Sequence, residues 1–370
     1  MENHTLIGAL KRLDWSLFIA TFLLAALGLS ALYSVTINVD DPDYTQLTRQ
    51  IIFAVIGIII LLVCAQFDYR LWWSSGWLSF FLGVVLLLGV LLFGETIRGT
   101  KGWFVIFGQS FQPIEFVRIF YLLFLARYFT TRMQSDSTLR TIVVSGLLTM
   151  IFIVLLILQP EFGYAAVLAA IWLIFILFLK IPRWQVGLVI VLLIAVSAVS
   201  WFYILEDYQK DRFIAYLNPS NDQLGRSYNV TQSIVAIGSG QLFGRGLGLG
   251  PQSQLNFLPE QSTDFIFAVI AEELGFLGTC LILGLFILIF ARLYRAIRIS
   301  NDTYATLLLS AILMMLFIQM SVNIGMNLGL LPITGIPLPF VSHGGSAIIS
   351  NFALIGIAQS FLIRQYRLNK

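Results

Sequence analysis

Long apolar runs separated by short polar stretches make up most of this sequence. Ten runs have the length that crosses a bilayer, about 17–25 residues, and lie near 15–35, 50–67, 74–93, 114–130, 141–159, 162–179, 184–205, 265–290, 303–323 and 342–363. Pro160 separates the fifth run from the sixth, because proline removes a helical hydrogen-bond donor. The pattern predicts an all-α polytopic membrane protein with about ten transmembrane helices.

Composition supports this class of protein. Of the 370 residues, 58% are hydrophobic and 11% are charged, whereas about 25% are charged in a soluble domain. The net charge of +3 is small, so no nucleic-acid partner is expected. The first apolar run lacks a small-residue cleavage site, which favours a retained helix over a signal peptide. We therefore expect a multi-pass protein whose surroundings include membrane lipids.

The distribution of basic residues predicts the orientation. With the N-terminus in the cytoplasm, fourteen Lys and Arg residues lie inside and seven outside, as the positive-inside rule requires. Both termini are then cytoplasmic, and the 206–263 segment is one long extracytoplasmic loop. Its part from Tyr228 to Ile237 is amphipathic enough to lie on the membrane surface or to re-enter the membrane. No linker or internal repeat is visible, so residues 1–370 are predicted to form a single domain.

The stretch from Gly244 to Gly275 combines glycines, carboxylates and an apolar helix that is expected to begin at about Phe265. Asp264 lies at the outer mouth of this helix. Ser262, Thr263 or Asp264 could cap free backbone N–H groups there. Alternatively, Asp264 and the nearby Glu260 could supply a general base or bind a metal.

Four further charges lie inside the apolar runs. Glu272 and Glu273 are about two turns into the eighth run, where they either fix helix packing or serve function. Glu115 and Arg118 are three residues apart and therefore share one helix face. This second pair is either a structural ion pair or a cavity wall that contacts a charged headgroup.

Two irregular segments on the outer side are candidate cavity walls. Glu161 follows Pro160 at a helix break, and such breaks at membrane depth occur where protein buries them or a wet cavity lies beside them. The last outer turn, 331–346, contains three prolines and three glycines and no fixed charge. It includes His343, which could titrate, and ends at Ser346.

Five outer cations could bind an anion such as pyrophosphate. They are Arg98, Lys101, Arg212, Arg226 and Arg245. Each of these side chains alone is typical of a solvated surface, and only the five together indicate an anion-binding site. The glycines that precede Pro251 follow no strand, so a nucleotide site is not favoured.

Five blocks of the chain together resemble the SEDS family of shape, elongation, division and sporulation proteins, which includes RodA, FtsW and SpoVE. The blocks are Leu258 to Gly275, Gly99 to Arg118, Gln159 to Gly163, Tyr228 to Gly240, and Pro337 to Ser346. The resemblance covers essentially the whole chain, and ten helices also fit this family. Two shorter segments, Ile336-Pro-Leu-Pro and Gln252-Ser-Gln-Leu, look more like the elongation branch than the division branch.

The resemblance implies a peptidoglycan glycosyltransferase that polymerises lipid II at the outer face of the bacterial cytoplasmic (inner) membrane during elongation and cell-shape maintenance. It also implies inversion at the sugar, a class B penicillin-binding protein as partner and other elongation-complex membrane proteins nearby. No cofactor is certain, although a divalent cation such as Mg or Mn could assist. A lipid II flippase, a division-type polymerase and a non-catalytic scaffold are the alternatives.

The family pattern also assigns residues. Asp264 matches the essential aspartate, and Glu115 with Arg118 matches an intramembrane acid–base pair in which lysine is common. The chain departs from the pattern at four positions, where aspartate, histidine, tyrosine and arginine are usual: Glu161, Ser262, His343 and Gly102. Supporting roles are expected for Glu161, Lys101, Arg212, Arg245, Glu260, Glu272 and Ser346.

Overall fold

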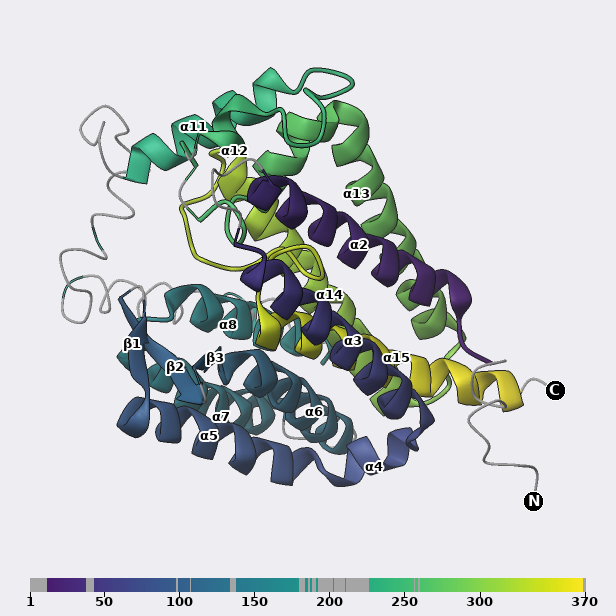
Figure 1. Cartoon of the computed structure of the whole chain (residues 1–370). Helices are drawn as coiled ribbons and strands as arrows, with labels where there is room; N and C mark the ends of the chain where they lie inside the picture. Colours follow the sequence, from purple (N-terminus) through teal and green to yellow (C-terminus); the bar gives the residue numbers. More distant parts are fainter. Residues whose placement is uncertain are drawn as a thin grey trace.

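The computed structural model is a bundle of long helices with a small sheet at one end (Figure 1). It describes residues 12–37, 43–97, 99–106, 108–133, 138–179, 226–255, 257–258 and 260–368, with isolated positions between 184 and 210. The long helices are α2 Trp15–Ile37, α3 Thr45–Gln66, α5 Gly76–Phe93, α6 Ile114–Arg132, α7 Thr138–Leu158, α8 Phe162–Phe178, α13 Ile266–Ile299, α14 Thr303–Asn327 and α15 Gly345–Leu368. The short helices are α4 Tyr69–Ser74, α11 Arg226–Ser239 and α12 Pro251–Gln254.

The polytopic helical class is confirmed. Within the described part of the chain, seven helices are long and apolar enough to cross a membrane, and α8 is a shorter apolar helix of 17 residues. Helix α6 carries the predicted intramembrane charges Glu115 and Arg118. The predicted run 184–205, and the predicted loop as far as residue 225, lie outside the described residues except for isolated positions. The count of ten spans therefore stays a prediction.

Helix α15 lies inside the bundle, where 89% of its apolar window is buried. It packs along α3, while α5 packs along α6 and α13 packs along α2 and α14. A Cβ at Gly356 would lie 2.6 Å from the carbonyl oxygen of Leu61 on α3. The absence of a side chain at Gly356 thus lets the two backbones approach closely, which is a common device for helix packing in membranes.

The two ends of the described chain meet at one end of the bundle. The Asp14 backbone nitrogen, just before α2, donates to Gln359 Oε1 on α15 at 3.0 Å. Arg292 Nη2, near the end of α13, forms an ion pair with Asp14 Oδ2 at 2.5 Å. Both ends of the described chain therefore lie on the same side, as the prediction that both termini share one compartment requires.

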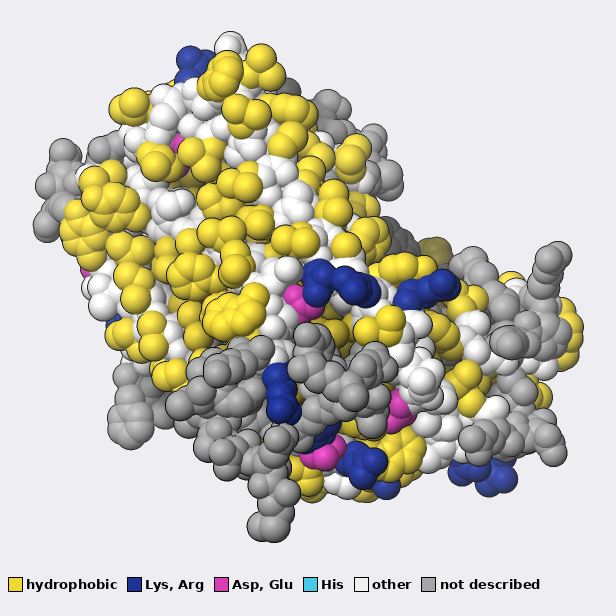
Figure 2. All heavy atoms as spheres, turned by 90° about the vertical axis from the view of Figure 1, so that its right-hand side faces the viewer, with side chains coloured by type: hydrophobic (Ala, Val, Ile, Leu, Met, Phe, Trp, Pro, Cys, Tyr) yellow, Lys and Arg dark blue, Asp and Glu magenta, His cyan; other side chains and the backbone are white. Residues whose placement is uncertain are grey.

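Figure 2 shows one face of the bundle, with hydrophobic side chains spread over its upper part and most of the Lys and Arg side chains in its middle and lower parts. On α13, for example, the exposed apolar residues include Phe276 at 59% and Ile287 at 66% relative exposure. Exposed apolar area on this scale identifies a surface made for lipid or for partner helices.

A three-stranded antiparallel sheet connects α5 to α6. Its strands are β1 Glu95–Ile97, β2 Thr100–Ile106 and β3 Gln109–Phe111, in the order β1-β2-β3. The connections use Gly99 and Gly108, with φ of +81° and +74°, values that glycine adopts readily. The sequence analysis did not predict this sheet, because two of its strands have only three residues.

Helix α13 is broken at Gly275, where φ is +64° and ψ is −160°. The 240–246 segment satisfies the backbone groups that the break frees. Phe276 N donates to Gln241 O at 2.8 Å, and Arg245 N donates to Glu272 O at 2.9 Å. The outer part of α13, which begins at the predicted site, is thus a short half-helix held from the side by an irregular segment.

Candidate active site

Asp264 lies in the turn that leads into α13. Its backbone N–H donates to Glu260 O at 3.1 Å. Its carbonyl oxygen accepts from Asn327 Nδ2 at 2.9 Å and from Asn323 Nδ2 at 3.3 Å. Both backbone polar groups of Asp264 are therefore fixed, and its side chain is partly buried.

The predicted capping role does not match the structure. The N-cap position of α13 belongs to Phe265, which makes no side-chain cap bond. None of the three predicted capping residues, Ser262, Thr263 or Asp264, occupies that position. The chain enters the helix one residue later than a cap at Asp264 would require, because the turn closes on the Glu260 carbonyl, which accepts from Thr263, Asp264 and Phe265.

The segment 331–344 forms one wall beside Asp264. A Cβ at Gly335 would lie 3.9 Å from Asp264 Oδ2, so the backbone of Gly335 faces the carboxylate. His343 N donates to Ser262 O at 2.8 Å, which ties the two segments together. On its other side this wall reaches α8, because a Cβ at Gly163 would lie 2.9 Å from Thr334 O.

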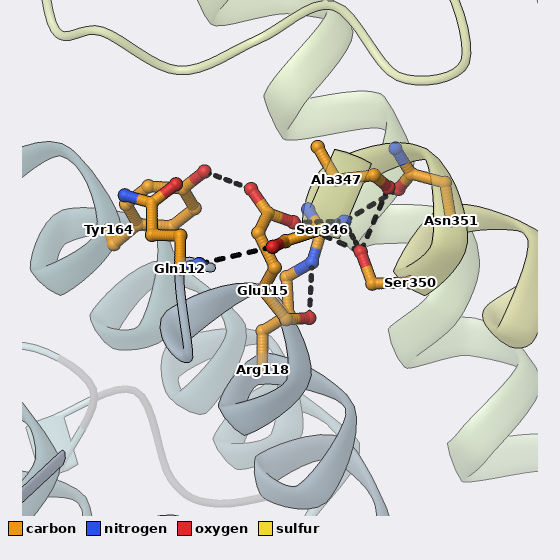
Figure 3. Close-up of polar contacts among 8 residues, drawn as sticks. All are labelled: Gln112, Glu115, Arg118, Tyr164, Ser346, Ala347, Ser350 and Asn351. Carbon is orange, nitrogen blue, oxygen red and sulfur yellow. Dashed lines mark hydrogen bonds and ion pairs between the residues drawn. The ribbon is translucent and has the colours of Figure 1, made fainter. Parts of the chain in front are cut away.

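Glu115 and Arg118 form the predicted ion pair, with Arg118 Nη2 2.6 Å from Glu115 Oε2, and the two side chains are 0% and 1% exposed. Figure 3 shows the polar groups around them. Tyr164 OH on α8 donates to Glu115 Oε1, and Ser350 Oγ on α15 donates to Oε2 at 3.0 Å. Arg118 Nη2 also donates to Ser350 Oγ and Asn351 Oδ1, each at 2.7 Å. The pair therefore joins α6, α8 and α15 in one buried network, in which Arg118 Nη1 has no hydrogen-bond partner among the described residues.

A second chain of bonds leads outward from this network. The backbone N–H of Gln112 donates to Ser346 Oγ at 3.0 Å at the start of α15. Gln112 Nε2 donates to Glu161 Oε1 at 3.1 Å. A Cβ at Gly102 on β2 would lie 2.8 Å from the same Glu161 oxygen. Glu161 and Ser346 are thus brought together through Gln112 beside β2, the central strand of the sheet.

Glu272 and Glu273 have structural partners. The Glu272 carboxylate, fully buried, accepts from Gln252 N at 2.8 Å and from Ser253 N at 3.0 Å in the first turn of α12. Glu273 Oε1 accepts from Ser34 Oγ on α2 and from Gly248 N at 3.2 Å. These bonds correspond to the packing alternative for the two residues, and substrate binding by Glu272 stays a prediction.

Of the five predicted outer cations, the structure describes the side chains of Lys101 and Arg245. Successive strand side chains point to opposite faces, and the Gly102 position faces Glu161, so Lys101 on β2 points the other way. Arg245 is exposed beside the break in α13, where its backbone bonds to Glu272. Arg98 and Arg212 lie outside the described residues, as does the side chain of Arg226. Roles for these cations stay predictions.

Glu260 is exposed, and its φ of +54° fits the tight turn before Asp264. Its Oε2 accepts from Thr263 Oγ1 at 3.2 Å. Across the described residues, no three His, Cys, Asp or Glu side chains form a group that could hold a metal ion. The described residues therefore give no support for a metal site formed only by protein carboxylates such as Glu260 and Asp264.

Sequence reasoning did not single out four of the residues that organise the site. These buried residues are Tyr164, Ser350, Asn323 and Asn327. Buried polar groups are normally hydrogen-bonded, so a polar side chain inside an apolar run was an available signal. Their partners lie far away in sequence, however, and only the fold reveals them.

Comparisons with known proteins agree with this architecture. The family model FTSW_RODA_SPOVE, described as "Cell cycle protein", matches residues 14–366. The peptidoglycan glycosyltransferase MrdB of Escherichia coli K12 is 38% identical over 352 residues, covering 94% of this chain and 93% of MrdB. The peptidoglycan glycosyltransferase RodA of Treponema pallidum is 30% identical over 424 residues, covering 95% of this chain and 98% of that protein.

Solved structures give the same result. A chain of a peptidoglycan synthase complex, described as coordinating polymerization and crosslinking, superposes with a TM-score of 0.79 at 29% identity, covering 96% of this chain and 99% of its own length. The crystal structure of Thermus thermophilus RodA gives a TM-score of 0.71 at 28% identity, covering 96% of this chain and 98% of that one. Helix pattern, family model and solved relatives agree, and this integral membrane protein belongs to the FtsW/RodA/SpoVE family.

Proposed function

We propose that this chain is a peptidoglycan glycosyltransferase of the elongation type, which polymerises lipid II at the outer face of the bacterial cytoplasmic membrane. The proposal is supported by relatives named MrdB and RodA that match nearly the whole chain. It is also supported by a partly buried carboxylate, Asp264, in the turn that leads into an apolar half-helix. A lipid-anchored sugar would meet the protein at the end of such a helix.

Asp264 is proposed as the general base. It would remove the proton from a hydroxyl of the acceptor sugar while the hydroxyl oxygen bonds to the anomeric carbon of the donor. The bond from that carbon to the pyrophosphate oxygen breaks at the same time, and the lipid pyrophosphate leaves with the electron pair. Attack opposite to the leaving group inverts an α linkage to a β linkage.

The observation that carries this role is the fixed geometry of Asp264. Two asparagine amides hold its carbonyl oxygen, and Gly335 lines its carboxylate without a side chain between them. A positioned base typically contributes about 10²–10⁴-fold in rate. The N-terminal end of α13 also favours a negative charge at this place, which keeps the carboxylate available as a base.

Glu161, Gln112 and Ser346 are proposed to line the neighbouring part of the substrate site. They meet beside the central strand β2, next to the start of α8, where Gly163 approaches Thr334 of the 331–344 wall. The buried network of Glu115 and Arg118 lies behind them and would hold α6 and α15 in register. Lys101, Arg212 and Arg245 are proposed, as cations, to attract the pyrophosphate groups.

A divalent cation is part of the proposal as a helper of the leaving group. Mg²⁺ is commonly held by one or two carboxylates together with substrate phosphates, so Asp264 or Glu161 would suffice once pyrophosphate is bound. A bound cation would offset negative charge on the departing pyrophosphate. We expect chelation with EDTA to abolish polymerisation and added Mg²⁺ or Mn²⁺ to restore it. Full activity in EDTA would remove the metal from the mechanism.

The proposed partner is a single-span class B penicillin-binding protein that crosslinks the new strands. Support comes from the similar chain in a peptidoglycan synthase complex and from the exposed apolar face of the bundle. Both termini are proposed to be cytoplasmic, with the 206–263 segment outside.

Reconstitution tests the function directly. Purified protein in detergent is incubated with lipid II, and the products are resolved on a glycan-length gel. We expect polymer from the wild-type chain, more polymer with the partner, and almost none from Asp264→Asn. Transfer of lipid II across liposome membranes without polymer would instead establish a flippase, and stimulation of a partner without polymer of its own would establish a scaffold.

A further inference from the structure

We propose that Asn327 on α14 is a positioning residue for Asp264, because it caps α13 from a neighbouring helix and at the same time holds the Asp264 carbonyl. This inference rests on the proposed function of Asp264 as the base. Asn327 is the last residue of α14 and is fully buried. Its amide bonds to the Asp264 backbone carbonyl, and we assign it no catalytic role of its own.

Asn327 caps the start of α13. The first turn of a helix has backbone N–H groups without intrahelical partners, and a side chain at the N-cap usually satisfies one of them. The N-cap residue here is Phe265, which has no polar side chain. Asn327 Oδ1 instead accepts from Ala268 N, the third residue of the helix, at 3.2 Å. Asn327, which is 59 positions from Ala268 in the sequence, thus makes the bond that an N-cap side chain normally makes.

The nitrogen of the same Asn327 amide holds Asp264. Asn327 Nδ2 donates to the Asp264 carbonyl oxygen at 2.9 Å. One planar group therefore fixes both the helix start and the residue before it. Ser233 Oγ on α11 donates to the Asn327 backbone carbonyl at 2.8 Å, which ties this junction to the outer helix.

Asn323, one turn earlier on α14, completes the arrangement. Its Nδ2 donates to Ile336 O at 2.9 Å and to Asp264 O at 3.3 Å. Ile336 follows Gly335, whose backbone faces the Asp264 carboxylate. Asn323 thus links Ile336, in the 331–344 wall, to Asp264 beside that wall.

The bond to the first turn of α13 at Ala268 N is thus made by Asn327. An aspartate that capped its own helix would have its carboxylate turned toward backbone N–H groups and away from substrate. With Asn327 as the cap, the Asp264 side chain can face Gly335 and a substrate hydroxyl. Loss of the asparagine would let the carboxylate move, and a displacement of about 1 Å can reduce a rate about 10²-fold.

Three variants separate positioning from general stability. Asn327→Ala removes both bonds of the amide. Asn327→Asp keeps an oxygen for Ala268 N but places a second oxygen against the Asp264 carbonyl. The matched control is Gln319→Met, two turns earlier on α14, because Gln319 is fully buried and neither of its amide atoms bonds to a described residue.

The experiment combines polymerisation kinetics with hydrogen–deuterium exchange of peptides that cover residues 264–274, both on purified protein in detergent. For Asn327→Ala we expect kcat to fall about 10–100-fold with KM for lipid II within about threefold, and faster exchange in the first turn of α13. For Asn327→Asp we expect slow exchange as in the wild type but a similar fall in kcat. Gln319→Met should leave kcat and exchange unchanged.

Each outcome decides the question. Normal kcat in Asn327→Asp, unchanged exchange in Asn327→Ala, or an equal loss in Gln319→Met would overturn the positioning role. Should Asn327→Ala fail to fold, Asn327→Asp and Asn323→Ala still test the hold on the Asp264 carbonyl, and normal kcat in both would overturn the positioning role. If the wild-type chain makes no polymer, the proposed function fails, whereas the exchange data still decide whether Asn327 caps α13.

Discussion

At the scale of single residues, the two central carboxylates have different surroundings. Glu115 is fully buried, and both of its oxygens are bonded to side chains of the protein. Asp264 is partly buried and has its backbone held by amides of α14. A carboxylate that is closed in by protein groups suits a structural role, and one that is fixed at an accessible place suits proton transfer.

Asp264→Asn should therefore fold, reach the membrane and bind lipid II, yet lose at least about 100-fold in polymerisation rate, because an amide cannot take the proton. Asp264→Glu should also be severely impaired, since the carboxylate moves by about one bond length. The rate is measured from gel-resolved glycan strands. Glu260→Gln, in the same turn, serves as a comparison and should lose less activity than Asp264→Asn, because Glu260 is exposed. Near-normal polymer from Asp264→Asn would move the base to Glu161 or Glu260.

Removal of either partner of the buried pair leaves a charge without its counterpart. Breaking such a pair costs about 3–5 kcal/mol of stability, so Glu115→Ala and Arg118→Ala should lower the thermal unfolding temperature in detergent. Exchange of the two residues should recover part of the loss, because a glutamate at 118 can accept from Ser350, whereas Tyr164 would lose its carboxylate. An exchanged protein less active than both single variants would indicate direct headgroup contact.

At the scale of elements, the break in α13 shapes the outer half of the molecule. Helix α13 has 34 residues, but the break at Gly275 lets its first part end inside the bundle. The carboxylates of Glu272 and Glu273 then bind backbone N–H groups of the 248–253 segment. These carboxylates thereby satisfy backbone N–H groups of the irregular 248–253 segment, as backbone at membrane depth requires.

Gly275→Ala should destabilise the protein. The added Cβ would lie 2.2 Å from Gly244 N, and the backbone has φ of +64°. Such a conformation costs about 1–3 kcal/mol for a residue with a side chain, in addition to the steric conflict. Thermal unfolding in detergent measures the effect.

The control lies on the same helix. Gly284→Ala places a Cβ with nothing within 4 Å, and alanine favours a helix by up to about 1 kcal/mol over glycine. This second variant should be as stable as the wild type or more stable. Equal stability of the two variants would show that the break tolerates a side chain and that the 240–246 segment adapts.

At the scale of the whole molecule, one end of the bundle carries the chain ends and the other carries the proposed chemistry. Asp14, Arg292 and Gln359 join α2, α13 and α15 at the first end. Asp264 lies before α13, at the opposite end of that helix from Arg292, and the sheet lies before α6. A bundle of this kind places a catalytic group at one membrane surface while the basic residues hold the other surface in the cytoplasm.

The orientation predicts where reporters are active. A reporter fused after Asn218 should behave as extracytoplasmic, and one after Asn301, in the connection between α13 and α14, should behave as cytoplasmic. Paired alkaline phosphatase and fluorescent-protein fusions measure the two outcomes. The reverse pattern would place Asp264 in the cytoplasm and would exclude polymerisation at the outer face.

Much of the fold could be predicted from the sequence because its signals are local. A bilayer demands about 20 apolar residues for each span, and the apolar runs therefore marked the long helices that the structure describes. The spacing of Glu115 and Arg118 fixes a shared helix face, and Pro160 ends a helix. The position of Asp264 before α13 follows from where the apolar run begins, and the family blocks added its expected role.

The tertiary structure alone decided which groups meet. The sequence offered Ser262, Thr263 or Asp264 as the cap of α13, but the bond to Ala268 comes from Asn327, on another helix. Glu272 and Glu273 were ambiguous until the fold placed the 248–253 segment against them. These contacts join residues between 19 and 59 positions apart. Local propensity carries no information about such pairings, because they depend on how whole helices pack.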